Sequence, residues 1–163
     1  MKPLIRQAPL VVVVASIAIL ATAFAFQYIG GLAPCELCIL QRWPYVATIA
    51  LGLLALWAAR SGQAGMARGL VALAGLVFLI GAGIAAYHVG VEQKWWQGPS
   101  TCTGLGLGGS IDDILKRIEN APVVRCDEIV WSLFGISMAG YNFLLSLALA
   151  GFCALSARSG KTA

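Results

Sequence analysis

Four long apolar runs alternate with polar segments along the chain. They cover residues 8–28, 39–59, 69–91 and 129–157, and their only charged or histidine side chains are Arg42 and His88. A helix needs about 20 mostly apolar residues to cross the hydrocarbon core of a bilayer. The pattern therefore predicts an all-α membrane protein in which four transmembrane helices form one bundle, a single domain over residues 1–163.

One polar segment is much longer than the others. It covers residues 92–128, between the third and fourth runs, and includes a glycine-rich stretch at 103–110. Ser110 is a suitable N-cap, and residues 111–119 place isoleucine and leucine at amphipathic spacing with two aspartates in the first turn. We expect a short amphipathic helix there, lying on the membrane surface.

Composition and charge agree with a membrane protein. Of the 163 residues, 60% are hydrophobic and 11% are charged, far from the balance of a soluble domain. The net charge of +4 does not indicate nucleic-acid binding, because its positive excess lies beside the spans, where it sets orientation. The termini and the loop between the second and third runs hold only basic charges, namely Lys2, Arg6, Arg60, Arg68, Arg158 and Lys161.

The distribution of charge predicts the topology. All seven acidic residues lie in the other two loops, which also carry the cysteine pairs. Basic residues are enriched in cytoplasmic loops, so we place both termini in the cytoplasm and the cysteine loops outside. The N-terminus also imitates a cleavable signal peptide, with an Ala-Thr-Ala site at 21–23, but its apolar run is longer than usual and we expect it to remain as a span. The loop orientation is the same in either case.

The five cysteines fall into two groups. Cys153 lies inside the fourth apolar run and is best explained as a small buried hydrophobe. Cys35, Cys38, Cys102 and Cys126 lie on the predicted oxidising side, where disulfides persist. These four can pair in three ways. The CxxC spacing and the shared long loop favour Cys35 with Cys38 and Cys102 with Cys126 at rest.

The stretch PCELCILQR, residues 34–42, opens the second apolar run. Pro34 suits the approach to a helix, and a helix N-terminus stabilises a thiolate at Cys38. Arg42 follows Cys38 by four residues and Cys35 by seven, so a helix would place all three on one face. An arginine inside a span is costly and is a functional residue by default, although it could also anchor the span end.

A CxxC at the edge of the hydrocarbon layer can meet a lipid-soluble oxidant. A disulfide that is repeatedly reduced and restored needs an electron acceptor, and a membrane quinone fits this location. Arg42 could stabilise both the Cys38 thiolate and the negative charge that develops on a quinone oxygen.

These residues resemble one family across essentially the whole chain. PCELCILQR at the start of the second of four spans, followed by two cysteines in the long outer loop, is similar to the bacterial disulfide bond formation protein B family, DsbB and its DsbI-like relatives. The resemblance implies a bacterial inner-membrane enzyme that oxidises a periplasmic DsbA-like protein of thioredoxin fold and reduces ubiquinone or menaquinone. No metal is expected.

The resemblance also implies a role for each site residue. Cys102 would form the mixed disulfide with the partner, and Cys126 would be its leaving and resolving thiol. Cys35 would then pass the electrons to Cys38, which contacts the quinone with the help of Arg42. His88, at the outer end of the third run, matches a family histidine near the quinone, although it could equally be an interface residue.

Two other interpretations stay open. A vitamin K epoxide reductase-like thiol oxidoreductase also has four spans and a CxxC, but its loop cysteines precede that motif. A membrane scaffold without catalysis would use its outer cysteines as disulfide staples or as zinc ligands.

Overall fold

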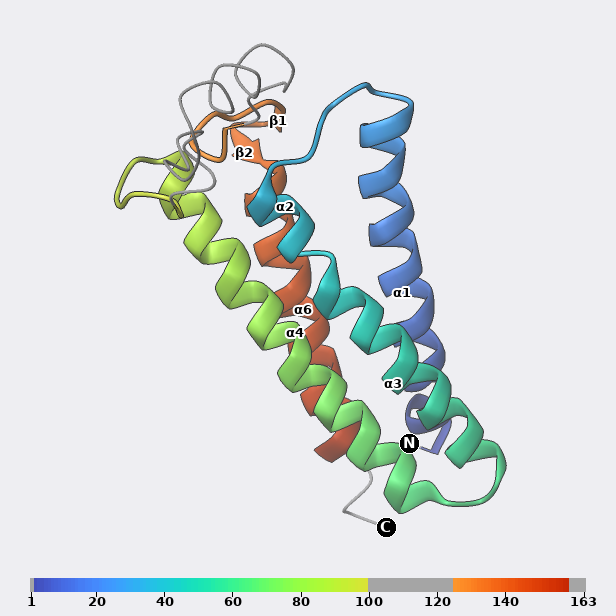
Figure 1. Ribbon diagram of the computed structural model, residues 1–163. Helices are drawn as coiled ribbons and strands as arrows, with labels where there is room; N and C mark the ends of the chain where they lie inside the picture. Colours follow the sequence, from blue (N-terminus) through green and yellow to red (C-terminus); the bar gives the residue numbers. More distant parts are fainter. Residues whose placement is uncertain (1, 100–124, 159–163) are drawn as a thin grey trace, which may run out of the picture.

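The computed structural model of this protein describes residues 2–99 and 125–158, which form a bundle of long helices (Figure 1). Cys102 and the amphipathic helix expected at 111–119 lie outside the described residues. Four described segments are long and apolar enough to cross a membrane: Gln7–Tyr28, Glu36–Arg60, Ala64–Glu92 and Met138–Arg158. The prediction of an all-α, multi-pass membrane protein is confirmed.

The first three spans follow the apolar runs closely. Helix α1 covers Lys2–Tyr28, α3 covers Trp43–Arg60 and α4 covers Ala64–Glu92. The second span is interrupted, because a short helix, α2 (Glu36–Leu40), precedes α3. Pro44 stands near the start of α3 and has no backbone N–H to donate to Leu40, so the helical hydrogen bonds cannot run on through this point.

The fourth span begins later than its apolar run predicts. Residues 129–137 were expected to belong to the span, but they contain a hairpin of β1 (Ser132–Leu133) and β2 (Ile136–Ser137), and α6 covers only Met138–Arg158. The hairpin turns at Phe134 and Gly135, whose φ angles are 51° and 77°. Two consecutive positive φ angles match a type I′ turn, a geometry that a helix cannot contain. Ser137 then accepts a hydrogen bond from the backbone of Gly140 and caps α6.

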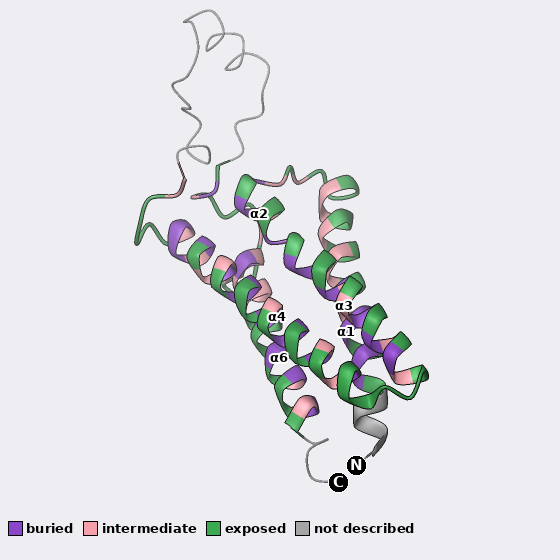
Figure 2. Cartoon of the chain, turned by 60° about the horizontal axis from the view of Figure 1, so that its bottom comes forward, coloured by how far each residue is buried: buried purple, intermediate pink, exposed green. Residues whose placement is uncertain are grey.

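Small residues bring the helices together. Helix α4 packs against α3 and α6, and α1 packs mainly against α3. A side chain at Gly52 would meet Val13 of α1 at 2.6 Å, and one at Gly75 would meet Cys153 of α6 at 2.9 Å. These close approaches are typical of membrane helices, in which packing rather than hydrophobic burial drives association. Buried residues face the neighbouring helices, while exposed ones cover the outer faces (Figure 2).

The two ends of the bundle differ in content. Helix α1 begins and α6 ends at one end, where the α3–α4 connection also lies (Figure 1). We call this the terminal end, and we call the opposite one, which holds Cys35 and Cys38, the cysteine end.

Candidate functional site

The CxxC motif lies at the start of α2. Cys35 is the N-cap of this helix, and its Sγ accepts a hydrogen bond from the backbone N–H of Cys38 at 3.2 Å. The Cys35 thiol also donates to the Cys38 Sγ across 2.8 Å. Both are free thiols, since a disulfide would bring the sulfurs to about 2.05 Å. The structure thus shows the reduced pair, whereas the spacing favours the disulfide at rest.

The two sulfurs differ in environment. Cys35 is only 5% exposed, while Cys38 is more open. The pKa of Cys35 is raised, first because its thiol donates to Cys38 and then because it is buried. Cys38, as the acceptor of that hydrogen bond, is the sulfur on which negative charge is stabilised. The hydrogen bond from Cys35 therefore favours the thiolate form at Cys38 rather than at Cys35.

Cys126 joins the CxxC from a distant part of the sequence. It is 1% exposed and packs in one buried cluster with Cys35, Leu37 and Val91, against which Cys38 also lies. Cys126 is disulfide-bonded, whereas Cys35 and Cys38 are free. The predicted pairing with Cys102 lies outside the described residues. The structure therefore places a disulfide-bonded cysteine beside a reduced dithiol, as thiol–disulfide exchange requires.

His88 reaches the same cluster from α4. The ring is 3% exposed, and its Nε2 lies 3.7 Å from the Cys35 Sγ. The side chain also hydrogen-bonds to the backbone of Cys126. His88 is thus a neighbour of the cysteines, and the structure brings it to Cys35 rather than leaving it at the bundle surface.

Sequence reasoning missed the residues behind His88. The Gln41 Nε2 lies 2.7 Å from the His88 Nδ1, and Asn142 of α6 donates to the other end of the Gln41 amide. Gln41 is 5% exposed. The available signal was a polar side chain inside an apolar run, because such a group must find a hydrogen-bond partner within the bundle.

Cys35, Cys38 and His88 are also a conceivable metal site. Their ligand atoms lie within 4.8 Å of one another, and two cysteines with one histidine are ligands that zinc accepts. The amide of Gln41, however, donates to the Nδ1 of His88, which leaves the ring proton on Nε2. A protonated Nε2 cannot bind a metal. The arrangement favours a hydrogen-bonded thiol site over a zinc site.

Arg42 contacts helix α1. Its Nη1 donates to the Gln27 Oε1 of α1 at 2.7 Å, and its Cζ lies 4.8 Å from the centre of the Phe24 ring. These contacts are with α1, whereas Cys35 packs in the buried cluster with Val91 and Cys126. The Arg42 charge still acts on Cys38 electrostatically. Cys38 therefore has the buried cluster on one side and a guanidinium within electrostatic range.

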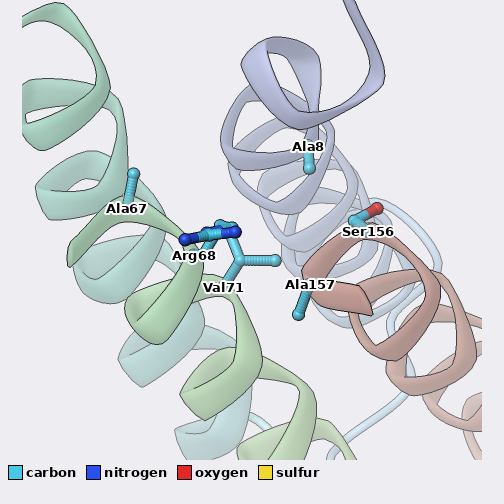
Figure 3. Close-up of a pocket in the computed structure, with 6 residues that line it drawn as sticks. All are labelled: Ala8, Ala67, Arg68, Val71, Ser156 and Ala157. Carbon is cyan, nitrogen blue, oxygen red and sulfur yellow. The ribbon is translucent and has the colours of Figure 1, made fainter. Parts of the chain in front are cut away.

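A separate pocket lies at the terminal end. It is lined by residues near the start of α1, the start of α4 and the end of α6, namely Ala8, Ala67, Arg68, Val71, Ser156 and Ala157 (Figure 3). No cysteine that the structure describes lines it, so the candidate site is the thiol cluster at the cysteine end.

A membrane-spanning helical bundle that carries a dithiol beside a disulfide-bonded cysteine defines a class, the membrane thiol–disulfide oxidoreductases. The family model described as "Disulfide bond formation protein DsbB" matches residues 5–156 of the chain. This protein belongs to the DsbB family, and its role is therefore that of a membrane disulfide oxidase.

Curated relatives agree with this assignment. The chain is 32% identical to disulfide bond formation protein B of Saccharophagus degradans over 97% of this chain and 94% of the relative. It is 34% identical to disulfide bond formation protein B 2 of Pseudomonas aeruginosa, over 88% of this chain and 83% of the relative. An uncharacterized protein of Rickettsia prowazekii is 30% identical, over 90% and 84% respectively. No solved structure matches the chain significantly.

Proposed function

We propose that this protein is a thiol:quinone oxidoreductase of the bacterial inner membrane. It reoxidises a periplasmic DsbA-like protein of thioredoxin fold and passes two electrons to ubiquinone or menaquinone. One observation carries the proposal: disulfide-bonded Cys126 packs in the same buried cluster as the reduced pair of Cys35 and Cys38. Electrons can cross between two such pairs by thiol–disulfide exchange.

The first steps are exchanges between sulfurs. A thiolate of the reduced partner attacks Cys102, the disulfide between Cys102 and Cys126 breaks, and Cys126 leaves as a thiolate. The partner's second thiol resolves the mixed disulfide and departs as the oxidised protein. Cys126 or Cys102 then attacks Cys35, and Cys38 leaves as a thiolate. The other thiol of the Cys102 and Cys126 pair attacks the cysteine now bound to Cys35, which re-forms the Cys102–Cys126 disulfide and releases Cys35 as a thiol. The packing of Cys126 and Cys35 in one buried cluster supports this order.

The residues around Cys38 fit a quinone acceptor. Cys38 is the more open sulfur of the pair, and large apolar side chains beside it are exposed on the outer surface of the bundle: Ile39, Leu40 and Trp43. A ring dissolved in lipid would meet this apolar surface and the Cys38 sulfur together. Arg42, held by Gln27 over Phe24, supplies positive charge for a quinone oxygen. The quinone takes up two electrons and two protons as quinol, and Cys35 and Cys38 return to the disulfide.

The central test is turnover. Purified protein in lipid nanodiscs is mixed with a reduced thioredoxin-fold oxidase and ubiquinone-1 or menaquinone-1, and quinone absorbance is followed. We expect turnover in the wild type and in Cys153→Ser, which alters a buried cysteine far from the site, and a loss of at least about 1000-fold in Cys38→Ser. Absence of turnover with both quinones, or full activity of Cys38→Ser, would leave a scaffold as the better explanation.

The order of exchange has its own test. In Cys126→Ser, Cys102 has no cysteine to pair with in the long loop, so its thiol should attack the disulfide of an oxidised partner, and a mixed disulfide through Cys102 should accumulate and be visible on a non-reducing gel. Recovery of the adduct through Cys35 or Cys38 instead would overturn the order proposed here.

Arg42 should matter for the quinone and not for the partner. We expect Arg42→Ala and Arg42→His to raise the apparent KM for quinone by about tenfold or more, because a charge-assisted contact is lost. Exchange with the partner, measured in a single turnover without quinone, should stay at the wild-type rate. An unchanged KM would remove Arg42 from the quinone site.

A further inference from the structure

A continuous chain of side-chain hydrogen bonds connects the cysteines to the middle of the bundle. It passes from α6 to α3, back to α6, to the α2–α3 junction, to α4 and finally to the start of α2. Its members, in order, are Ser146, Tyr45, Asn142, Gln41, His88, Cys35 and Cys38. Only the last three belong to the proposed sulfur chemistry and its immediate neighbourhood.

A backbone carbonyl fixes the direction of this chain. The amide nitrogen of Gln41 lies 3.2 Å from the carbonyl oxygen of Leu37 and 2.7 Å from the Nδ1 of His88. A carbonyl oxygen only accepts, so the Gln41 atom facing Leu37 must be the NH₂ group. The same NH₂ group therefore donates to the Nδ1 of His88.

Every other bond then runs in the same sense. The Gln41 Oε1 must accept, and it does so from the Nδ2 of Asn142. The Oδ1 of Asn142 accepts from the Tyr45 hydroxyl, which has one proton, so Ser146 donates to Tyr45 at 2.8 Å. Each hydrogen bond in the chain thus points toward the cysteines.

The chain determines what His88 presents to Cys35. Because Nδ1 accepts from Gln41, the proton of the neutral ring resides on Nε2. This nitrogen lies 3.7 Å from the Cys35 Sγ and is also the donor in the hydrogen bond of the ring to the backbone of Cys126. Cys35 in turn donates its thiol proton to Cys38. The opposite tautomer would present a lone pair to Cys35 and draw its proton away from Cys38.

We propose that Gln41, Asn142 and Tyr45 are positioning residues that hold His88 as the Nε2–H tautomer and thereby favour the reduced form of the CxxC pair. The Cys35–Cys38 disulfide is reduced by a donor pair that consists of one thiol and one thiolate. The donor pair becomes a disulfide, and its two electrons break the bond between Cys35 and Cys38. One proton is then held on Cys35 and the negative charge on Cys38. The consequence for turnover rests on the proposed function, whereas the two tests below need neither quinone nor partner.

The tautomer can be observed directly, because His88 is the only histidine of the chain. In reduced protein labelled with ¹⁵N-histidine, the wild type should show an unprotonated Nδ1 and a protonated Nε2 at neutral pH. Gln41→Glu replaces the donor by a carboxylate that accepts, so a proton should appear on Nδ1. Gln93→Glu adds the same charge at an exposed position five residues after His88 and should leave the ring unchanged. A wild-type proton on Nδ1, or no change in Gln41→Glu, would refute the proposal.

The redox equilibrium gives the second test. The protein is equilibrated with glutathione, thiols are trapped with iodoacetamide, and the fraction of reduced Cys35 and Cys38 is read by mass spectrometry. Gln41→Met and Asn142→Leu should shift the equilibrium toward the disulfide several-fold, where tenfold corresponds to about 30 mV. Tyr45→Phe removes only one oxygen, so it serves as the test if the other two variants fail to fold. Its redox equilibrium should shift in the same direction by a smaller factor.

Tyr141→Phe is the matched control for these variants. Its hydroxyl donates to the carbonyl of Leu133 at an exposed position of α6, next to Asn142 in sequence and outside the chain of hydrogen bonds. It should keep the wild-type equilibrium. An equal shift in this control, or an unchanged equilibrium in all three chain variants, would overturn the positioning role even if the protein turns over quinone.

Discussion

The two halves of the bundle are held by different forces. In the terminal half, α1, α3, α4 and α6 meet through an apolar cluster that includes Val12, Ala55, Val71 and Phe78. In the cysteine half, α2, α3, α4 and α6 meet through the hydrogen-bond chain. Tyr45 belongs to both, since its ring lies 6.0 Å from that of Phe78 while its hydroxyl is part of the chain.

This contrast indicates that the two halves have different roles, one in stability and the other in orienting the site. Hydrogen bonds between membrane helices contribute only about 0.6 kcal/mol each on average, because the unfolded state in the membrane also finds partners. Packing therefore accounts for most of the stability, and the polar chain serves mainly to orient His88 and the cysteines. The predictions below test this division, beginning with the largest effect.

Phe78→Ala should destabilise the bundle most. The side chain is fully buried in the terminal half, and its removal leaves a cavity that the surrounding helices cannot fill, at a cost of about 3 to 5 kcal/mol. Unfolding in SDS titrations should occur at clearly lower detergent fraction. The redox equilibrium of the CxxC pair should stay unchanged in the folded fraction. An unaltered midpoint would contradict the role of packing.

The two sulfurs of the pair should differ in reactivity by more than about tenfold. The raised pKa of Cys35 keeps it as a thiol at pH 8, and only thiolates react rapidly with iodoacetamide. In reduced protein, alkylation should therefore occur at Cys38 first. Reaction at Cys35 should accelerate as the pH rises toward its pKa, because the thiolate fraction increases in that direction. Equal labelling of both at pH 8, resolved by mass spectrometry, would contradict the hydrogen bond between them.

Tyr45→Phe should distinguish the contribution of packing from that of hydrogen bonding, because Tyr45 belongs to both halves of the bundle. It keeps the ring that packs on Phe78 and removes the hydroxyl with its hydrogen bonds to Asn142 and Ser146, so at about 0.6 kcal/mol each the loss of stability should be about 1.2 kcal/mol. Comparison with Phe78→Ala in the same SDS titration gives the measurement. A loss as large as that of Phe78→Ala would show that the polar chain holds the bundle together.

Arg125→Ala should have the smallest effect. Arg125 is exposed and its hydrogen bonds to Asp127 hold the pKa of that carboxyl below its ordinary value. In the variant the pKa of Asp127 should rise toward the ordinary value, as followed by carboxyl ¹³C NMR. Any stability from this pair is present above the unfolded pKa of Asp127 and is lost as the pH falls through its folded pKa. Because solvent screens an exposed pair, the unfolding midpoint of the variant at neutral pH should be nearly the same as that of the wild type.

The spans were predictable because lipid imposes a length on every crossing helix. The apolar runs at 8–28, 39–59 and 69–91 match α1, α3 and α4 within a few residues. The predicted start of the fourth span at residue 129 was wrong, because hydrophobicity does not distinguish an apolar hairpin from a helix. Phe134 shows why: it is 91% exposed in the turn, yet its side chain suits a span equally well.

The site was predictable only where a short motif carries it. Cys35 and Cys38 are close because they lie three positions apart at the start of a helix, so the spacing predicts their contact. The contact of Arg42 with Gln27 of α1 was not predictable, because no local pattern signals a contact between separate helices. Gln41 and Asn142 were missed because 101 residues separate them, and no local pattern signals such a contact.

The sequence by itself determined a four-span membrane bundle with a dithiol at the mouth of its second span, because hydrocarbon thickness and helical repeat act locally on the chain. The tertiary structure alone decided that Cys126 and His88 meet that dithiol and that a one-way hydrogen-bond chain stands behind them. Those contacts depend on how helices distant in sequence pack, and packing is fixed only when small residues such as Gly52 and Gly75 let particular helices approach.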